Sequence, residues 1–367
     1  MKDIVITRKI QLNFDVADKA ELKLKFKKIY EWQRICHKAA NWVATHQYIQ
    51  SEIQSIHYIV NEEKVKLADV HKDEDGILTT SRQNTTYQVL SRAFKGEAPM
   101  AMLTALNAVV SGTVKQELQE VRMGKRSLRT YRDTIPMPMP SGSFRTWKKS
   151  EDGNYTFELF DLSFKTYFGR DLSGNEVILD SALAGEYKLC DSSLQLKKGK
   201  IFLLAVFKLP PTPVKLLEGK VCAAELSADY PIIANIGKKT LMIGTAEEYL
   251  HRRVQIQRAL QRLQAASRYN EGGKGRTKKL AALDRFHEKE NNYVTTKAHQ
   301  YSSMLIDHCV KHKCAQLVLK KQTAKQEEAK AEFEQGEPFL LRNWGYYGLK
   351  EKIAYKCRKF GIELIVE

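Results

Sequence analysis

The stretch VCAAELSADYPIIANIGKKTLMIGT, residues 221–245, decides the fold of the C-terminal part of the chain. It holds three short apolar runs separated by turn residues, a pattern typical of a three-stranded antiparallel meander. Pro210, Pro211 and Pro213 precede it and form a stiff linker. We therefore expect a new domain to start near residue 214.

The segments that follow extend this pattern to the end of the sequence. We predict two polar helices (245–268 and 277–312), a strand (315–320), a helix (343–359) and a last strand in GIELIVE (361–367). Strand, strand, strand, helix, strand, helix, strand is the order of an RNase H-like domain. The Lys-, Glu-, Gln- and Ala-rich residues 322–336 are expected to form an exposed connector.

An RNase H-type nuclease holds two Mg²⁺ ions about 4 Å apart between carboxylates. The first carboxylate stands on the first strand and the second at the end of the fourth, where Glu225 and Lys320 are found here. Glu225 is one methylene longer than the usual Asp, and a lysine has no lone pair to offer a metal when charged. The sequence ends after the fifth strand, so we also expect the third ligand to be absent. The prediction is a degenerate site without metal, cofactor or enzymatic activity.

The N-terminal third is predicted to be one strand followed by helices. Residues 4–14 alternate between apolar and polar, and Asp18 is a suitable helix N-cap. Apolar positions then recur every three to four residues, which indicates helices over 18–60, 62–71, 80–95 and 100–122.

Strand patterns replace helical ones after residue 134. The prolines of IPMPMPSGSFRTW (135–147) suit an extended edge strand. We predict further strands in YTFELFDLSF (155–164) and NEVIL (175–179), and a hairpin over 193–209 with its turn at Gly199. These strands suggest a small β-barrel that residues 4–14 also join.

Charge indicates the class of partner. The 367 residues include 60 Lys and Arg against 43 Asp and Glu, a formal charge of +17. Such an excess favours a polyanion such as nucleic acid, because neutralised phosphates release counterions. Without an 18-residue apolar run or a signal peptide, we expect a cytoplasmic protein without membrane contact.

The six cysteines form no CxxC pair, so we expect reduced thiols. A metal site built from Cys309, Cys314, His308 and His312 is an alternative, but Cys309 is expected to pack inward on a helix.

Two basic clusters exceed the background charge, and arginine suits forked contacts with phosphate. The first, which we call the basic track, consists of Arg252, Arg253, Arg258, Arg262, Arg268, Lys274, Arg276, Lys278 and Lys279. The second, the arginine cluster, consists of Arg122, Lys125, Arg126, Arg129 and Arg132. Both are predicted to bind RNA or DNA, although a solvated basic helix remains an alternative for the track.

Several segments together resemble the miniature type V-F CRISPR effectors and the related TnpB proteins. They are KVCAAELSADYPIIANIG (220–237), HRRVQIQRALQRL (251–263), YNEGGKGRTKKL (269–280), LRNWGYYGLKEKIAYKCRKFGIEL (341–364) and IPMPMPSGSF (135–144). Their order and spacing match from about residue 130 onward.

The resemblance implies an α+β multidomain fold. Its parts would be a first wedge strand (1–16), an inserted helical recognition domain (17–133), a wedge-type β-barrel (134–213) and a truncated, inactive RuvC-like α/β domain (214–367) without zinc ribbon. The family places its first catalytic Asp at Glu225 and its catalytic Glu at Lys320.

The resemblance also implies a function. A nuclease-dead relative would bind a guide RNA and complementary double-stranded DNA next to a short duplex motif, with two protomers sharing one guide. The bound protein would lie on the bacterial nucleoid and would regulate transcription. It would do so by recruiting a sigma factor and RNA polymerase, or by occluding a promoter.

The duplex motif would be read by polar side chains near residue 80. Bidentate donors and acceptors suit contacts with base edges. The candidates are Thr80, Ser81, Arg82, Gln83 and Asn84, for which an exposed helix start is an equal alternative. Trp344 is expected to plug the core or stack on a base.

Two other functions stay open. One is an active metal-dependent endonuclease that uses Asp229 or Glu363 in place of the lost ligands. The other is a guide-free basic protein that binds structured RNA.

Overall fold

The computed structural model describes residues 4–61, 82–169, 174–211, 214–225, 230–268, 273–320 and 346–367. Within them, the side chains of 57–59, 61, 82–85, 246, 250, 267–268, 273–280, 282, 284 and 346–347 are not described. The chain forms two compact units: unit 1 comprises Met1–Ile4 and Pro210–Glu367, and unit 2 comprises Val5–Leu209. The division falls at the predicted proline linker. The finer division into four domains stays a prediction.

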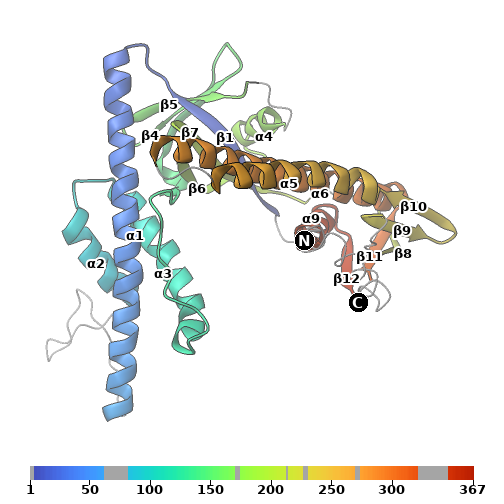
Figure 1. Cartoon of the computed structure of the whole chain (residues 1–367), viewed down its shortest axis with the longest axis horizontal. Coiled ribbons are helices and arrows are strands. Elements are labelled where there is room, and N and C mark those ends of the chain that lie inside the picture. Colours follow the sequence, from blue (N-terminus) through green and yellow to red (C-terminus); the bar gives the residue numbers. More distant parts are fainter. Residues whose placement is uncertain are drawn as a thin grey trace. The chain divides into compact units, whose positions relative to one another are not determined.

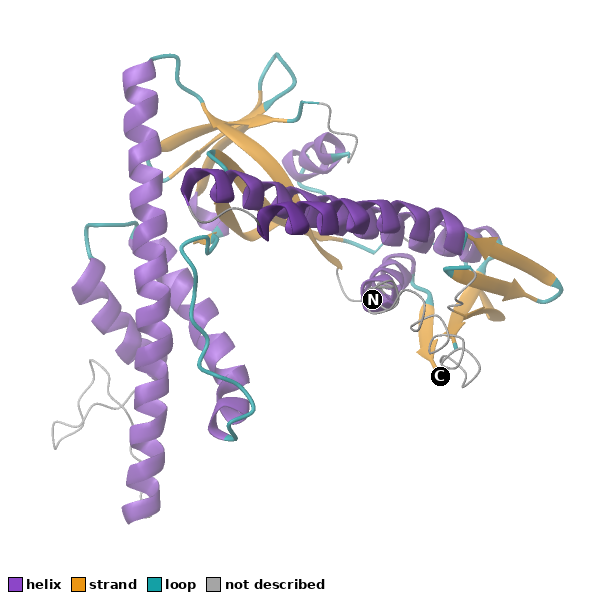
Figure 2. Cartoon of the chain, in the orientation of Figure 1, coloured by secondary structure: helices purple, strands orange, loops and turns teal. Residues whose placement is uncertain are grey.

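Unit 2 contains a seven-stranded sheet (Figures 1 and 2). Its order is β2-β6-β7-β1-β5-β4-β3. The N-terminal strand therefore joins strands from much later in the chain, as predicted; its position between two of them was not predicted. The strands are β1 (Ile4–Phe14), β2 (Met137–Met139), β3 (Phe144–Lys149), β4 (Tyr155–Leu159), β5 (Leu162–Tyr167), β6 (Lys188–Lys197) and β7 (Lys200–Leu209).

Local chemistry explains the strands. Ile10 and Leu12 of β1 are buried at alternate positions, and Phe14 stacks on Phe164 of β5 with ring centroids 5.1 Å apart. In the β6–β7 hairpin, Lys198 and Gly199 have φ of 53° and 75°, the signs that a two-residue type I′ turn requires. The proline-containing β2 is an edge strand, as expected.

Helices are inserted between β1 and β2. They are α1 (Lys19–Asn61), α2 (Arg82–Phe94) and α3 (Met100–Arg122), which confirms three predicted helices; the fourth, at 62–71, lies outside the described residues. The Asp18 carboxylate accepts a hydrogen bond from the Glu21 backbone N–H at 2.9 Å, so the predicted cap forms.

The predicted strand NEVIL is wrong. These residues begin the helix α4 (Asn175–Leu183), whose buried side chains are Asn175, Ile178 and Leu179. This i, i+3, i+4 spacing puts one face of a helix inward, whereas Val177, which a buried strand would enclose, is 68% exposed.

Unit 1 is built on a five-stranded sheet of order β10-β9-β8-β11-β12. The predicted succession of strands and helices is confirmed, although α6 begins at Gly273, four residues before its predicted start at residue 277. The elements are β8 (Leu217–Glu225), β9 (Ile232–Ile236), β10 (Lys239–Ile243), α5 (Ala246–Arg268), α6 (Gly273–Lys311), β11 (Cys314–Leu319), α9 (Tyr346–Phe360) and β12 (Glu363–Val366).

The core of unit 1 lies between one face of this sheet and the helices α6 and α9. Cys309 packs there without solvent exposure, which confirms its predicted inward position, and Cys222, Cys314 and Cys357 join it. All six cysteines are free thiols. None of the described helices is long and apolar enough to cross a bilayer.

Candidate nucleic-acid interface

The ends of β8 and β11 bring Glu225 and Lys320 next to each other. The two strands pair in parallel with Leu319 opposite Ala224, and the Lys320 backbone N–H donates to the Ala224 carbonyl oxygen at 2.9 Å. Glu225 and Lys320 each follow one of these residues. The two positions that sequence reasoning selected are therefore neighbours at one end of the sheet.

Both side chains point away from the core of unit 1. Ala224 and Leu319 are buried in that core, and side chains alternate between the faces of a strand. Glu225 is half-buried on the opposite face, and Lys320 is exposed. Among the described residues, this end of the sheet thus places the carboxylate of Glu225 and the ammonium group of Lys320 on the same face.

The arginines of the basic track whose side chains are described differ in exposure: three are exposed and one is buried. Arg252, Arg258 and Arg262 are exposed on α5. Arg253 is only 1% exposed, and its Nε and Nη2 donate to Glu290 Oε1 of α6 at 3.1 and 2.9 Å. Arg253 therefore belongs to a buried ion pair and offers no surface to a phosphate.

A second, partly buried contact completes this pair. Gln257 Nε2 donates to the other Glu290 oxygen at 2.6 Å, and the Arg253 guanidinium lies 5.6 Å from the ring centroid of Tyr249. Sequence reasoning missed Glu290, because it lies 37 residues from Arg253 in the chain. The side chains of Arg268, Lys274, Arg276, Lys278 and Lys279 lie outside the described ones.

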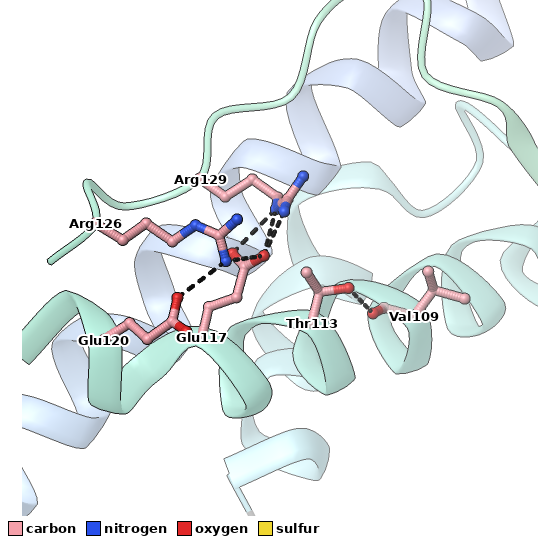
Figure 3. A network of polar contacts seen from close by, with 6 residues as sticks. All are labelled: Val109, Thr113, Glu117, Glu120, Arg126 and Arg129. Carbon is pink, nitrogen blue, oxygen red and sulfur yellow. Dashed lines mark hydrogen bonds and ion pairs between the residues drawn. The ribbon is translucent and has the colours of Figure 1, made fainter. Parts of the chain in front are cut away.

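The arginine cluster is partly neutralised by acids of α3 (Figure 3). Glu117 accepts hydrogen bonds from Arg129 and forms an ion pair with Arg126 at 2.9 Å, and Arg126 also reaches Glu120 at 3.4 Å. The hydrogen bond from Arg129 and the charges of both arginines lower the pKa of Glu117, although burial opposes them. Figure 3 also shows the Thr113 hydroxyl, which donates a hydrogen bond to the Val109 carbonyl oxygen at 3.0 Å within α3.

The remaining members of the cluster differ in their contacts. Arg122 donates to Glu52 Oε1 at 2.9 Å and to Ser51 Oγ at 2.7 Å, both on α1. Lys125 and Arg132 are exposed. Arg122, the last residue of α3, therefore ties α3 to α1, and Arg126 and Arg129 tie the following segment to α3. All five cations of the cluster remain exposed at the surface.

The candidates for reading a duplex motif are only partly described. Thr80 and Ser81 lie outside the described residues, as does Trp344. Arg82, Gln83 and Asn84 form the first turn of α2, which confirms the predicted helix start. Their base-reading role stays a prediction.

Comparisons with known proteins place this fold. No family model matches the chain. It is 25% identical over 264 residues to the CRISPR-associated endodeoxyribonuclease Cas12f1 of Sulfoacidibacillus thermotolerans, which covers 67% of this chain and 60% of the relative. It is 22% identical over 321 residues to the Cas12f1 of Syntrophomonas palmitatica, covering 80% and 62%. The matches thus span less than two thirds of the length of either relative.

A solved structure shares the fold. The chain matches the cryo-EM structure of a Cas12f1–sgRNA–target DNA complex with a TM-score of 0.64 and 15% identity, over 99% of this chain and 88% of that one. The class is therefore an α+β multidomain protein with the fold of a Cas12f1 chain. The resemblance to the miniature type V-F CRISPR effectors is confirmed by the sequence and fold matches together. The nuclease-dead form stays a prediction.

Proposed function

We propose that this chain is an RNA-guided DNA-binding protein that does not cut its target. Guide pairing would supply sequence specificity, and the protein would hold the heteroduplex by its backbone. The observation that carries the proposal is the placement of Glu225 and Lys320 next to each other at the ends of two paired strands. A positive charge here would repel both divalent ions that hydrolysis requires.

Lys320 is not compensated by the alternative carboxylate Glu363. Glu363 pairs with Gln316 in the β11–β12 ladder, and its Oε2 accepts a hydrogen bond from Gln316 Nε2 at 2.8 Å. Gln316 lies four residues before Lys320, which corresponds to roughly 13 Å along a strand. Ions about 4 Å apart cannot be shared over that span. Asp229, the other alternative, lies outside the described residues.

The output of binding would be regulation of transcription. A protein that holds DNA intact can recruit a sigma factor and RNA polymerase, or it can occlude a promoter. We favour recruitment, with occlusion as the nearest variant, and we expect the bound protein to lie on the nucleoid.

We also propose that two protomers share one guide RNA. The apolar side chains Ile49, Ile53, Ile56 and Val60 of α1 are 49–70% exposed and follow one another at helical spacings of four, three and four residues. Such a face supports contact with a second copy.

Sequencing the RNA that co-purifies with the protein from its host tests guide binding. We expect one small RNA with a constant scaffold and a variable end. A heterogeneous mixture would favour the guide-free RNA-binding alternative.

The purified complex is then incubated with matching DNA and Mg²⁺, with and without EDTA. We expect retention of the DNA without cleavage, also after Lys320→Glu, because Glu225 would still displace the first ion. Cleavage that EDTA abolishes would overturn the nuclease-dead proposal and leave guide binding intact. Robust cutting by Lys320→Glu alone would show that Lys320 is the single defect.

A further inference from the structure

Positive and histidine side chains gather at the end of the unit 1 sheet opposite to Glu225 and Lys320. His308 lies in the last turn of α6 and Lys311 is its last residue; His312 follows, and its backbone N–H donates to the His308 carbonyl oxygen at 3.1 Å. Lys220 is near the start of β8, and Lys239 is the first residue of β10. We call these five residues the histidine–lysine cluster.

Lys220 and Lys239 lie on the side of the sheet that faces α6. Lys220 lies two residues before the buried Cys222, and Lys239 lies two residues before Leu241, which packs against the core. Alternation puts Lys239 on the face that α6 covers. Lys220 lies within a register shift between Leu217 and Val221 of β8, and its electrostatic effect on His312 places it near that histidine. Three elements thus contribute to one cluster.

The two imidazole rings contact each other. Their centroids are 4.6 Å apart at 70°, an edge-on arrangement. Nε2 of His308 is enclosed by the protein, yet it has no hydrogen-bond partner within the described part of the chain. A buried polar nitrogen without a partner is costly, and a rotation of the ring that brings it to a bound ligand would remove that cost.

The charges that act on these rings all have the same sign. Burial lowers the pKa of His308, and His312, Lys311 and Lys239 lower it further. Burial, Lys239, Lys220 and Lys311 likewise lower the pKa of His312. The acids closest in sequence to the cluster on these elements are Asp307 of α6, which raises the pKa of Lys356, and Glu218 of β8.

We propose that the histidine–lysine cluster binds phosphate groups of a nucleic-acid backbone and binds them more tightly at acidic pH. The proposal rests on the proposed function for its ligand. Phosphate oxygens accept hydrogen bonds from the lysines, and protonation makes both nitrogens of each imidazole donors. The anion would offset the mutual repulsion of the cluster and would raise the pKa of both histidines.

A divalent metal fits the cluster less well. Two histidines one turn apart can chelate a transition metal, but three lysines would repel it. Among the described residues, no group of three His, Cys, Asp or Glu side chains is arranged to hold an ion. The charge of the cluster therefore selects an anion.

The test uses the whole chain, labelled poly(U) RNA and two conditions, about pH 5.5 and about pH 8, on either side of the ordinary histidine pKa of ~6.5. We expect the wild-type protein to gain affinity on acidification by about three- to tenfold more than His308→Gln/His312→Gln, the size of one ordinary net hydrogen bond. His287→Gln, which removes an exposed histidine elsewhere on α6, is the matched control and should keep the full gain. Urea melts of all variants verify folding.

Histidine NMR titrations separate the two proposals. If poly(U) binds and raises the pKa of His308 and His312, the cluster is a phosphate site. If poly(U) binds without moving either pKa, or if all variants gain equally, the inference is overturned while the proposed function stands. If poly(U) does not bind, pyrophosphate is the probe: raised histidine pKa values would retain the anion site but reject its use for an RNA backbone, and unchanged values would overturn the inference. The proposed function is tested separately, by the RNA that co-purifies with the protein. Zn²⁺ binding that displaces protons from both rings would overturn the anion assignment.

Discussion

Lys356 lies inside the contact between α6 and α9. It is 9% exposed, and its Nζ donates to the His299 carbonyl oxygen at 2.6 Å, to Ser302 Oγ at 2.9 Å and to Ser303 Oγ at 2.5 Å. Burial lowers the pKa of Lys356 to about 8, an effect that Lys359 and Lys352 strengthen and Asp307 opposes. This single side chain therefore couples the stability of unit 1 to pH.

We predict that Lys356 makes the protein more stable as pH rises from about 8 to about 10. In this window the unfolded chain keeps the proton of Lys356, whereas the folded chain has lost it. The free energy of unfolding then rises with pH, by up to ~1.4 kcal/mol per pH unit. Urea melts across this range should show the rise in wild type relative to Lys356→Met, since the tyrosines titrate in both proteins. Parallel curves would contradict the prediction.

The residues that could be predicted from sequence are those whose role follows from a position in a strand order. Glu225 and Lys320 were selected in this way, and the sheet places them together. Arg253 could not be separated from its exposed neighbours, because only tertiary structure brings Glu290 to it. The burial of the His308 Nε2 atom could not be predicted either, because it also depends on tertiary structure.

At the scale of elements, the α5–α6 hairpin is pinned by the pair of Arg253 with Glu290. We predict that Arg253→Leu lowers the free energy of unfolding by about 3–5 kcal/mol, because it leaves a carboxylate buried without its cation. The double variant Arg253→Leu/Glu290→Leu should recover most of this loss, since no lone charge remains. Chemical denaturation of the two variants measures both values.

Comparing the single with the double variant distinguishes the effect of the buried charge from the effect of side-chain packing. Equal destabilisation in the single and double variants would mean that packing of the arginine stem, and not the uncompensated carboxylate, is what the hairpin requires. Loss of the Arg253–Glu290 ion pair should also shift the exposed Arg258 and Arg262, because they lie on the same helix, α5.

Sequence predicted long periodic helices and the meander well, because their apolar spacing is repeated many times. It failed for α4, where five residues alone fit a strand and a helix equally. The helix N-terminus of α6 was also misplaced, because Gly273 and Gly275 are poor helix formers.

At the scale of the whole molecule, element order was predictable and the pairing of distant strands was only inferred. The position of β1 between β7 and β5 joins residues about 150 or more positions apart, as in the pair of Gln11 with Tyr167. Nothing local in residues 4–14 specifies those neighbours. The proline linker, by contrast, marked the unit boundary directly.

The formal charge of +17 raises the question whether nucleic-acid binding follows total charge or its placement. We predict that Arg258→Glu/Arg262→Glu weakens RNA binding and reduces the slope of log affinity against log salt by about two, roughly one per lost phosphate contact. Lys23→Glu/Lys27→Glu is the matched control, because it reverses two exposed cations at the same helical spacing on α1. Filter binding over a salt series should show an unchanged slope for this control. If the slope falls by the same amount in both variants, the protein binds RNA through its overall charge. The guide-free RNA-binding alternative would then be favoured over a defined binding track on α5.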